Sequence, residues 1–297
     1  MNLPIIYKDI SYIPNSTNSQ QTLDLIIPPF VNKVEEEDDD EKSLLPPIIV
    51  IIHGGAWVSG DKNDFTTMGH NLCESSHFAI AIVNYRLSTK ENPEIKHPIH
   101  VQDVASSIYW ISQHGKEYGF QETMIYLAGH SVGAFISGQL IFIPEFLDSH
   151  NPKLSEYIKG VIGIQGIYDV YSLFQIWPEY IKYIEPAFGK DELFYKKSSL
   201  TNNNIKGIDK IPPYLIIHSK EDELVDVNQS YNYYLYLKNC GGINIEFNTS
   251  LKGNHEGILQ TEELLKVIIE FIVMSELNVK DWNKLMNETM DKIKFDL

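Results

Sequence analysis

The stretch Ala128-Gly129-His130-Ser131-Val132-Gly133-Ala134 decides the fold that we predict for this chain. An apolar run over 124–127 precedes it, and residues 135–142 can continue as a helix. A serine held on a sharp turn between strand and helix needs neighbours without a Cβ atom, because larger ones would collide with both elements. The pattern therefore predicts a strained turn that holds Ser131 at the end of a buried strand.

A second motif strengthens this prediction. The apolar run 48–52 leads directly into a glycine loop. The loop residues are His53, Gly54, Gly55, Ala56 and Trp57. Strand, glycine loop and then Gly-x-Ser-x-Gly is the order found in α/β-hydrolases. We therefore predict an α/β-hydrolase fold: a mostly parallel central sheet with helices on both faces and a small helical cap insertion.

Composition limits the classes of protein to which this chain can belong. Its 297 residues are 43% hydrophobic, which indicates a globular protein, and we predict one domain over 1–297. The net charge of −16 argues against partners such as nucleic acid or an anionic membrane. Seven consecutive acids over 35–41 indicate a solvated surface loop spanning 30–45.

The cellular location is predicted from what the sequence does not show. The first residues lack a basic segment followed by a long apolar one, and no run of about 18 apolar residues occurs. The two cysteines, Cys73 and Cys240, form no disulfide framework and are expected to be reduced. We therefore expect a cytoplasmic protein.

Hydrophobic patterning predicts the order of the elements. Strands are expected over 5–13, 21–27, 48–52, 78–84, 124–127, 161–164, 214–218 and 243–248. Helices are expected over 64–75, 100–118, 135–142, 227–238 and 261–276. The aromatic stretch 171–205 indicates a helical cap insertion over the site. Alternation of strand and helix favours a parallel sheet.

The order of a hydrolase triad identifies the base by elimination, because nucleophile, acid and base follow one another along the chain. Three histidines follow Ser131. His150 lies in a turn ahead of every candidate acid, and His218 ends a strand before the acids beside it. His255 alone follows them, in a loop after a predicted strand. We therefore predict His255 as the general base.

The acid is chosen from four carboxylates in the segment 219–226. Asp222 is predicted, because a short side chain on a loop at the strand end suits a buried, oriented carboxylate. Asp226 is expected to cap the following helix, and Glu221 and Glu223 are expected to face water. The 33 residues from Asp222 to His255 leave room for one helix, one strand and two loops.

These residues would divide the chemistry among them. His255 would remove the proton of Ser131, and Asp222 would fix the imidazole tautomer and stabilise its cation. Backbone N–H groups would stabilise the tetrahedral oxyanion. The predicted donors are the N–H groups of Gly54, Gly55 and Val132.

Each of these residues also has a structural alternative. Ser131 is alternatively a serine in a tight turn, and His53 is expected to organise its loop rather than transfer protons. Trp57 suits the core as well as a pocket wall, and His130 is expected to be structural. The remaining histidines have no Cys or His partners at ligand spacing, so we predict no metal and no cofactor.

With these residues in place, the chain resembles the kynurenine formamidases (arylformamidases), especially the fungal type, from about residue 48 to 257. Six short segments carry the resemblance: 53–57 (HGGAW), 84–88 (NYRLS), 129–134 (GHSVGA), 166–169 (GIYD), 178–180 (PEY) and 218–224 (HSKEDEL). The acidic insertion at 35–41 departs from the family core. Ala56 stands where broader lipase relatives often have glycine, and it still supplies a backbone N–H.

The resemblance implies a function and a substrate. It assigns Ser131, Asp222 and His255 as nucleophile, acid and base, and it implies hydrolysis of N-formyl-L-kynurenine to L-kynurenine and formate, in tryptophan breakdown toward NAD. A homodimer is a further expectation from the family. An aromatic formamide would need an apolar cap. The residues expected to line it are Trp57, Tyr168, Phe174, Trp177 and Tyr180.

Two other functions fit the same motifs. A general carboxylesterase for short acyl esters shares every catalytic residue. A hydrolase-like scaffold that binds without catalysis is the second alternative, although such a protein would have no need of an intact triad and glycine loop.

Overall fold

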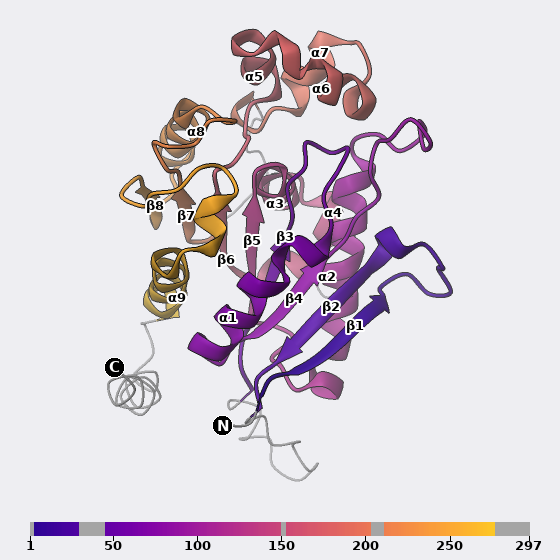
Figure 1. The fold of residues 1–297 in the computed structure, drawn as a ribbon, viewed down its shortest axis with the longest axis vertical. Coiled ribbons are helices and arrows are strands. Elements are labelled where there is room, and N and C mark those ends of the chain that lie inside the picture. The colour runs from indigo at the N-terminus through magenta and orange to yellow at the C-terminus, as the bar shows by residue number, and fades with distance from the viewer. Residues whose placement is uncertain (1–2, 30–44, 150–152, 203–210, 277–297) are drawn as a thin grey trace.

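Eight strands form one sheet at the centre of the protein (Figure 1). The computed structural model describes residues 3–29, 45–149, 153–202 and 211–276. The strands lie in the order β1-β2-β4-β3-β5-β6-β7-β8. β1 pairs antiparallel with β2, and β2 with β4, whereas every other pair is parallel. The strands are β1 (Ile5–Ser11), β2 (Thr22–Ile27), β3 (Ile48–Ile52), β4 (Ala79–Val83), β5 (Ile125–His130), β6 (Ile158–Ile164), β7 (Tyr214–Ile217) and β8 (Ile245–Asn248).

Helices cover both faces of this sheet. α1 (Thr66–Ser76) and α9 (Glu262–Glu276) contribute apolar side chains to one core cluster. α2 (Ile99–Tyr118), α3 (Val132–Phe142) and α8 (Val227–Asn239) contribute to the other. The five residues of β3 are at most 1% exposed, as a strand covered on both faces should be. The predicted fold class is confirmed.

The ends of some elements differ from the prediction. α3 begins at Val132, directly after Ser131, whereas the apolar pattern predicted a start at residue 135. The short helix α4 (Glu145–Asp148) was not predicted. Asp226 caps α8 as expected, because its carboxylate accepts a hydrogen bond of 2.7 Å from the N–H of Asn228.

Short helices fill the predicted cap between β6 and β7. They are α5 (Val170–Ile176), η5 (Pro178–Tyr180), α6 (Ile181–Phe188), α7 (Glu192–Ser198) and η6 (Leu200–Asn202). α5, α6 and α7 group together at one end of the molecule (Figure 1). The remaining short helices are η1 (Ser19–Gln21), η3 (Lys62–Phe65), η4 (Leu154–Tyr157) and η7 (Gly257–Gln260).

A buried lysine fixes the segment that follows the glycine loop. Lys62, in η3, has a side chain that is 3% exposed. Its ammonium lies 2.7 Å from a carboxylate oxygen of Asp24 in β2 and 2.8 Å from one of Asp9 in β1. A buried ammonium needs such partners, because desolvation without them is costly. These two ion pairs therefore anchor η3 to β1 and β2, the antiparallel strands at one edge of the sheet.

Some predictions fall on residues outside the described part. They include the acidic run 35–41, His150 and the segment 281–297, for which the sequence predicts a helix. Among the described residues, no helix is both long and apolar enough to span a bilayer. The assignment of 1–297 to a single domain stays a prediction.

Candidate active site

Ser131 stands on the strained turn that the sequence predicted. Its φ of 54° and ψ of −116° lie outside the usual regions for a residue with a side chain. A Cβ atom at Gly129 would overlap the carbonyl of Gly133, and one at Gly133 would overlap the carbonyl oxygen of Ile52. The two glycines therefore permit the close approach of β3, β5 and α3 that the turn requires.

The glycine loop after β3 lies against this serine. A Cβ atom at Gly54 would lie 2.9 Å from the Cβ of Ser131. Gly55 has a φ of 104°, a region that favours glycine. In the described part of the chain, the N–H groups of Gly54, Gly55 and Val132 donate to no protein acceptor. Three backbone donors beside the serine suit a developing oxyanion.

Tyr85 and His53 hold the glycine loop in place. The Tyr85 hydroxyl donates to the carbonyl oxygens of His53, at 2.9 Å, and Gly54, at 3.2 Å. The His53 ring stacks on Tyr85 at a centroid distance of 4.2 Å, and its Nδ1 donates to the Gly54 carbonyl at 2.7 Å. Burial lowers the pKa of His53. A neutral, stacked ring organises the loop, as predicted for His53.

Asp222 and His255 form a close pair. The Nδ1 of His255 donates to Asp222 Oδ2 at 2.8 Å, and the side chains are 4% and 1% exposed. The other carboxylate oxygen accepts from the N–H groups of Leu224 and Val225, each at 2.9 Å. Burial alone would raise the pKa of Asp222, but these hydrogen bonds and the His255 ring hold it below its ordinary value. The arrangement favours an ionised Asp222 and the Nδ1–H tautomer of His255.

Glu221 and Glu223 are exposed, as predicted, but both also accept hydrogen bonds from the loop of the base. Glu221 accepts a hydrogen bond of 3.0 Å from the N–H of Gly253, and Glu223 accepts one of 3.0 Å from the N–H of His255. Both glutamates are exposed, yet their carboxylates reach the neighbouring loop. The spacing of the four acids gave no sign of these contacts, because the partners are backbone groups about 30 residues away.

His130 brings the base loop next to the serine. Its ring centroid lies 4.6 Å from that of His255, and its Nε2 lies 2.9 Å from the His255 carbonyl oxygen. Among the described residues, the Ser131 hydroxyl forms no hydrogen bond with His255. Catalytic hydrogen bonds in ligand-free enzymes are often long and shorten when substrate binds.

Two of the five aromatic residues predicted to line the substrate site are buried in the core. Trp57 is 1% exposed and packs edge-on against Phe135 and Phe188. Tyr168 is fully buried and stacks on Tyr233 at 4.1 Å. Neither side chain is accessible to a substrate in this structure. Both were proposed because aromatic side chains near a site suit a pocket wall, but they serve packing here.

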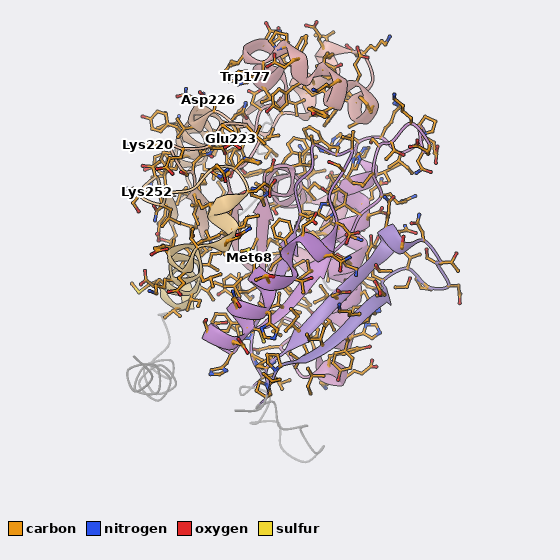
Figure 2. The ribbon with its side chains drawn as sticks, in the orientation of Figure 1. Met68, Trp177, Lys220, Glu223, Asp226 and Lys252 are labelled. Carbon is orange, nitrogen blue, oxygen red and sulfur yellow. The ribbon has the colours of Figure 1, made fainter. Side chains whose placement is uncertain are left out.

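The other three predicted residues lie on the cap. Phe174, in α5, is half-buried and packs edge-on against Tyr195. Trp177, directly after α5, is 37% exposed. Figure 2 shows Trp177 on the side of the molecule that carries Glu223 and Asp226. Of these two side chains, Trp177 is therefore the one that a substrate can reach more easily.

Tyr180, the third cap residue, contacts the loop that holds the acid. Its hydroxyl donates to the carbonyl oxygen of Leu224 at 2.6 Å. Burial raises the pKa of Tyr180, and the neighbouring carboxylate of Asp222 adds to this effect. Tyr180 thereby joins the cap to the acid loop as a neutral hydrogen-bond donor.

A cavity of about 400 Å³ opens beside the glycine loop. Asp64 and Phe65 of η3 line it, as do His130 and Glu256. Burial raises the pKa of Glu256, and the carboxylates of Asp64 and Glu223 add to this effect. The space lies between the glycine loop and the loop of the base, where part of a substrate could be held.

Two further groups of reactive side chains lie close together among the described residues. Within the described residues, ligand atoms of His130, His255 and Glu256 lie within 4.8 Å of one another. One ring nitrogen of each histidine already forms a hydrogen bond within the protein. That the protein holds no metal stays a prediction. Ser88 and His100 also form a hydrogen bond of 2.9 Å, but the Ser88 hydroxyl donates to the Ile95 carbonyl, which indicates a structural contact.

Comparison with known proteins places these features in a family. The BD-FAE family matches residues 37–237. A kynurenine formamidase of Meyerozyma guilliermondii is 29% identical over 226 residues, which are 74% of this chain and 82% of that protein. Another from Scheffersomyces stipitis is 27% identical over 248 residues, 74% and 88% of the two chains.

Solved structures agree on the fold. Esterase B of Lactobacillus rhamnosis has a TM-score of 0.73 at 19% identity. The superposition covers 97% of this chain and 89% of the esterase chain. The resemblance to fungal kynurenine formamidases that the motifs predicted is confirmed. Because the family match spans more than half of the sequence, this chain belongs to the BD-FAE family, with an α/β-hydrolase fold.

Proposed function

We propose that the protein is a serine hydrolase that cleaves N-formyl-L-kynurenine to L-kynurenine and formate, a step of tryptophan breakdown toward NAD. The hydrogen bond between Asp222 and His255, held beside the Ser131 turn, is the observation that carries the hydrolase chemistry. The substrate is supported by the names of the similar fungal proteins.

The first half of the reaction forms a formyl-enzyme. The Ser131 hydroxyl oxygen attacks the formyl carbon, and His255 Nε2 accepts the hydroxyl proton. The carbonyl π electrons move to the oxygen, which the N–H groups of Gly54, Gly55 and Val132 stabilise. When this intermediate collapses, the C–N bond breaks and His255 returns the proton to the aniline nitrogen, so that kynurenine leaves.

The second half releases formate. A water molecule gives its proton to His255 and attacks the formyl ester, and the same N–H groups hold the second oxyanion. Collapse breaks the bond to Ser131, which recovers its proton from His255. Asp222 stays ionised throughout and stabilises the imidazolium that forms in each half, consistent with its lowered pKa.

The site suits a small acyl group. Ser131 is only 5% exposed, so the nucleophile itself is largely covered by protein. A formyl group has one hydrogen on its carbonyl carbon and requires no acyl pocket. Partial enclosure of the aryl group by the cap would exclude water and position the scissile bond.

Purified protein incubated with N-formylkynurenine tests the proposal through the appearance of kynurenine absorbance. We expect kcat/KM for this substrate to exceed that for p-nitrophenyl acetate. A large preference for the ester would instead support the short-chain carboxylesterase. A fluorophosphonate probe is expected to label Ser131, and a folded protein that takes no label would support the non-catalytic binding protein.

Trp177 offers a test of the cap. Substitution of Trp177 by alanine is expected to raise KM for N-formylkynurenine about tenfold, because loss of an aromatic contact worth about 1.4 kcal/mol corresponds to that factor. The kcat should change little, since Trp177 is not part of the triad. Tyr231, 44% exposed on α8, provides the control: Tyr231→Ala should leave KM unchanged. An unchanged KM in Trp177→Ala would exclude Trp177 from the substrate contacts.

A further inference from the structure

Gln165 occupies a strained position between the strands that lead to the nucleophile and the acid. It follows β6 directly, and β6 pairs with β5 on one side and β7 on the other. Its φ of 48° lies in the left-handed region, which non-glycine residues seldom adopt. Its side chain is fully buried. Such conformations persist where the surroundings impose them, and they often mark functional sites.

The side-chain amide of Gln165 joins two loops. Its Oε1 accepts a hydrogen bond of 3.1 Å from the N–H of Ser219, at the start of the acid loop. Its Nε2 donates to the carbonyl oxygens of Asn254 and His255, each at 3.0 Å. Both donor hydrogens and the acceptor of the amide are therefore used.

The backbone around Gln165 is fixed to the nucleophile. The N–H of Ser131 donates to the Ile164 carbonyl at 2.9 Å, and the N–H of Ile167 donates to the Ser131 carbonyl at 3.2 Å. In the sequence, Gln165 lies between Ile164 and Ile167, and its own N–H donates to the Ile217 carbonyl at 2.8 Å. Its main chain is thus held at Ser131, while its side chain holds the main chain of His255.

We propose that Gln165 is a positioning residue that sets the distance of the His255 imidazole from the Ser131 hydroxyl. This inference rests on the proposed serine hydrolase function. The acid and base loops are joined to each other by Asp222 and Glu223, so they could shift together without breaking those contacts. Gln165 connects both loops to the end of β6, where the Ile164 carbonyl binds the N–H of Ser131. These hydrogen bonds oppose such a shift.

His130 contacts the same carbonyl oxygen of His255. Its Nε2 lies 2.9 Å from the His255 carbonyl oxygen, so this oxygen accepts from both Gln165 and His130. Burial lowers the pKa of His130 to about 3, and the neighbouring His255 adds to the effect. A neutral His130 with its proton on Nε2 is the matching donor.

The variant Gln165→Glu tests this role because glutamate has nearly the same size and shape as glutamine. A carboxylate keeps an acceptor for Ser219 but cannot donate to the carbonyls of Asn254 and His255. We expect kcat to fall about 100-fold, the cost of a misplacement of about 1 Å, with KM within about threefold of wild type. The rate of fluorophosphonate labelling at Ser131 should fall by the same factor.

The matched control is Gln139→Glu. Gln139 is also fully buried, and its Nε2 donates to a backbone carbonyl, that of Ser198, at 2.6 Å. It lies on α3 and its amide bonds to the end of the cap helix α7 rather than to the acid or base loop, so this variant should lose thermal stability while it keeps kcat and the labelling rate. Equal losses of labelling in the two variants would overturn the proposal.

The variant Gln165→Gly covers the case in which a buried glutamate prevents folding. Glycine adopts a φ of 48° without strain, and it removes the whole amide. A folded Gln165→Gly protein that labels within about threefold of the wild-type rate would overturn the proposal, and a fall of about 100-fold would support it. Because the probe reports on Ser131 alone, a wild type that labels but does not hydrolyse N-formylkynurenine would contradict the proposed substrate and leave this test intact.

Discussion

Substitution of Ser131 by alanine is expected to lower kcat for N-formylkynurenine about 10⁶-fold, the loss measured when a triad protease loses its nucleophile. The covalent route needs an oxygen at this position, and the methyl group of alanine provides none. Binding should persist, because Ser131 is only 5% exposed and contributes little surface to a substrate. Kynurenine release measured at saturating substrate, with KM or a direct binding constant alongside, checks both statements.

Ser88→Ala is the matched control for the nucleophile. Ser88 is also buried and also contacts a histidine, but its hydroxyl donates to the Ile95 carbonyl and lies outside the Ser131 turn. We expect the Ser88→Ala protein to keep its kcat and its fluorophosphonate labelling. If Ser131→Ala retained most of the activity, or if Ser88→Ala abolished labelling, the assignment of the nucleophile would be wrong.

The sequence was most informative where local pattern and tertiary structure require the same thing. The run 48–52 is apolar throughout because β3 is covered on both faces, and the predicted strand agrees with the structure residue for residue. The glycines at 129 and 133 were predicted from the sterics of a tight turn, and a Cβ at either position would overlap a backbone carbonyl. The order of the chain was enough to pair Asp222 with His255.

The predictions failed where the partner of a side chain lies far away in the sequence. Glu223 is exposed as predicted, but its hydrogen bond from the N–H of His255, 32 residues later, was not predicted. Tyr168 looked like a pocket residue, but its ring stacks on Tyr233. None of the sequence motifs included Gln165. A polar residue directly after a buried strand, between the nucleophile strand and the acid strand, was the available signal.

The second large effect is expected at Asp222. Substitution by asparagine should lower kcat about 10⁴-fold with little change in KM, as replacement of the triad acid does in serine proteases. The side-chain oxygen of the asparagine can still accept from Leu224 and Val225, so the loop should keep its shape. Its NH₂ group would donate to Nδ1 of His255 and favour the tautomer with the proton on Nε2. That tautomer cannot accept the Ser131 proton.

The control for this substitution is Asp226→Asn, four residues along the same loop. Asp226 caps α8, and asparagine caps helices as well as aspartate does, so activity and stability should both be kept. Equal activity losses in the two variants would show that general loop charge, rather than the acid of the triad, is what matters.

The pH dependence of unfolding gives an independent measurement on Asp222→Asn. The folded protein holds the pKa of Asp222 below its ordinary value of 3.8, so the ionised carboxylate stabilises the fold above that pH. This contribution is lost as the pH falls through the lowered folded value. The difference in unfolding free energy between wild type and Asp222→Asn should therefore be largest near pH 7 and shrink below about pH 4. Urea titrations at pH 7 and at pH 3.5 measure it, and a difference that grew toward acid would mean that Asp222 is protonated in the folded protein, which would remove its role as the anion that stabilises His255.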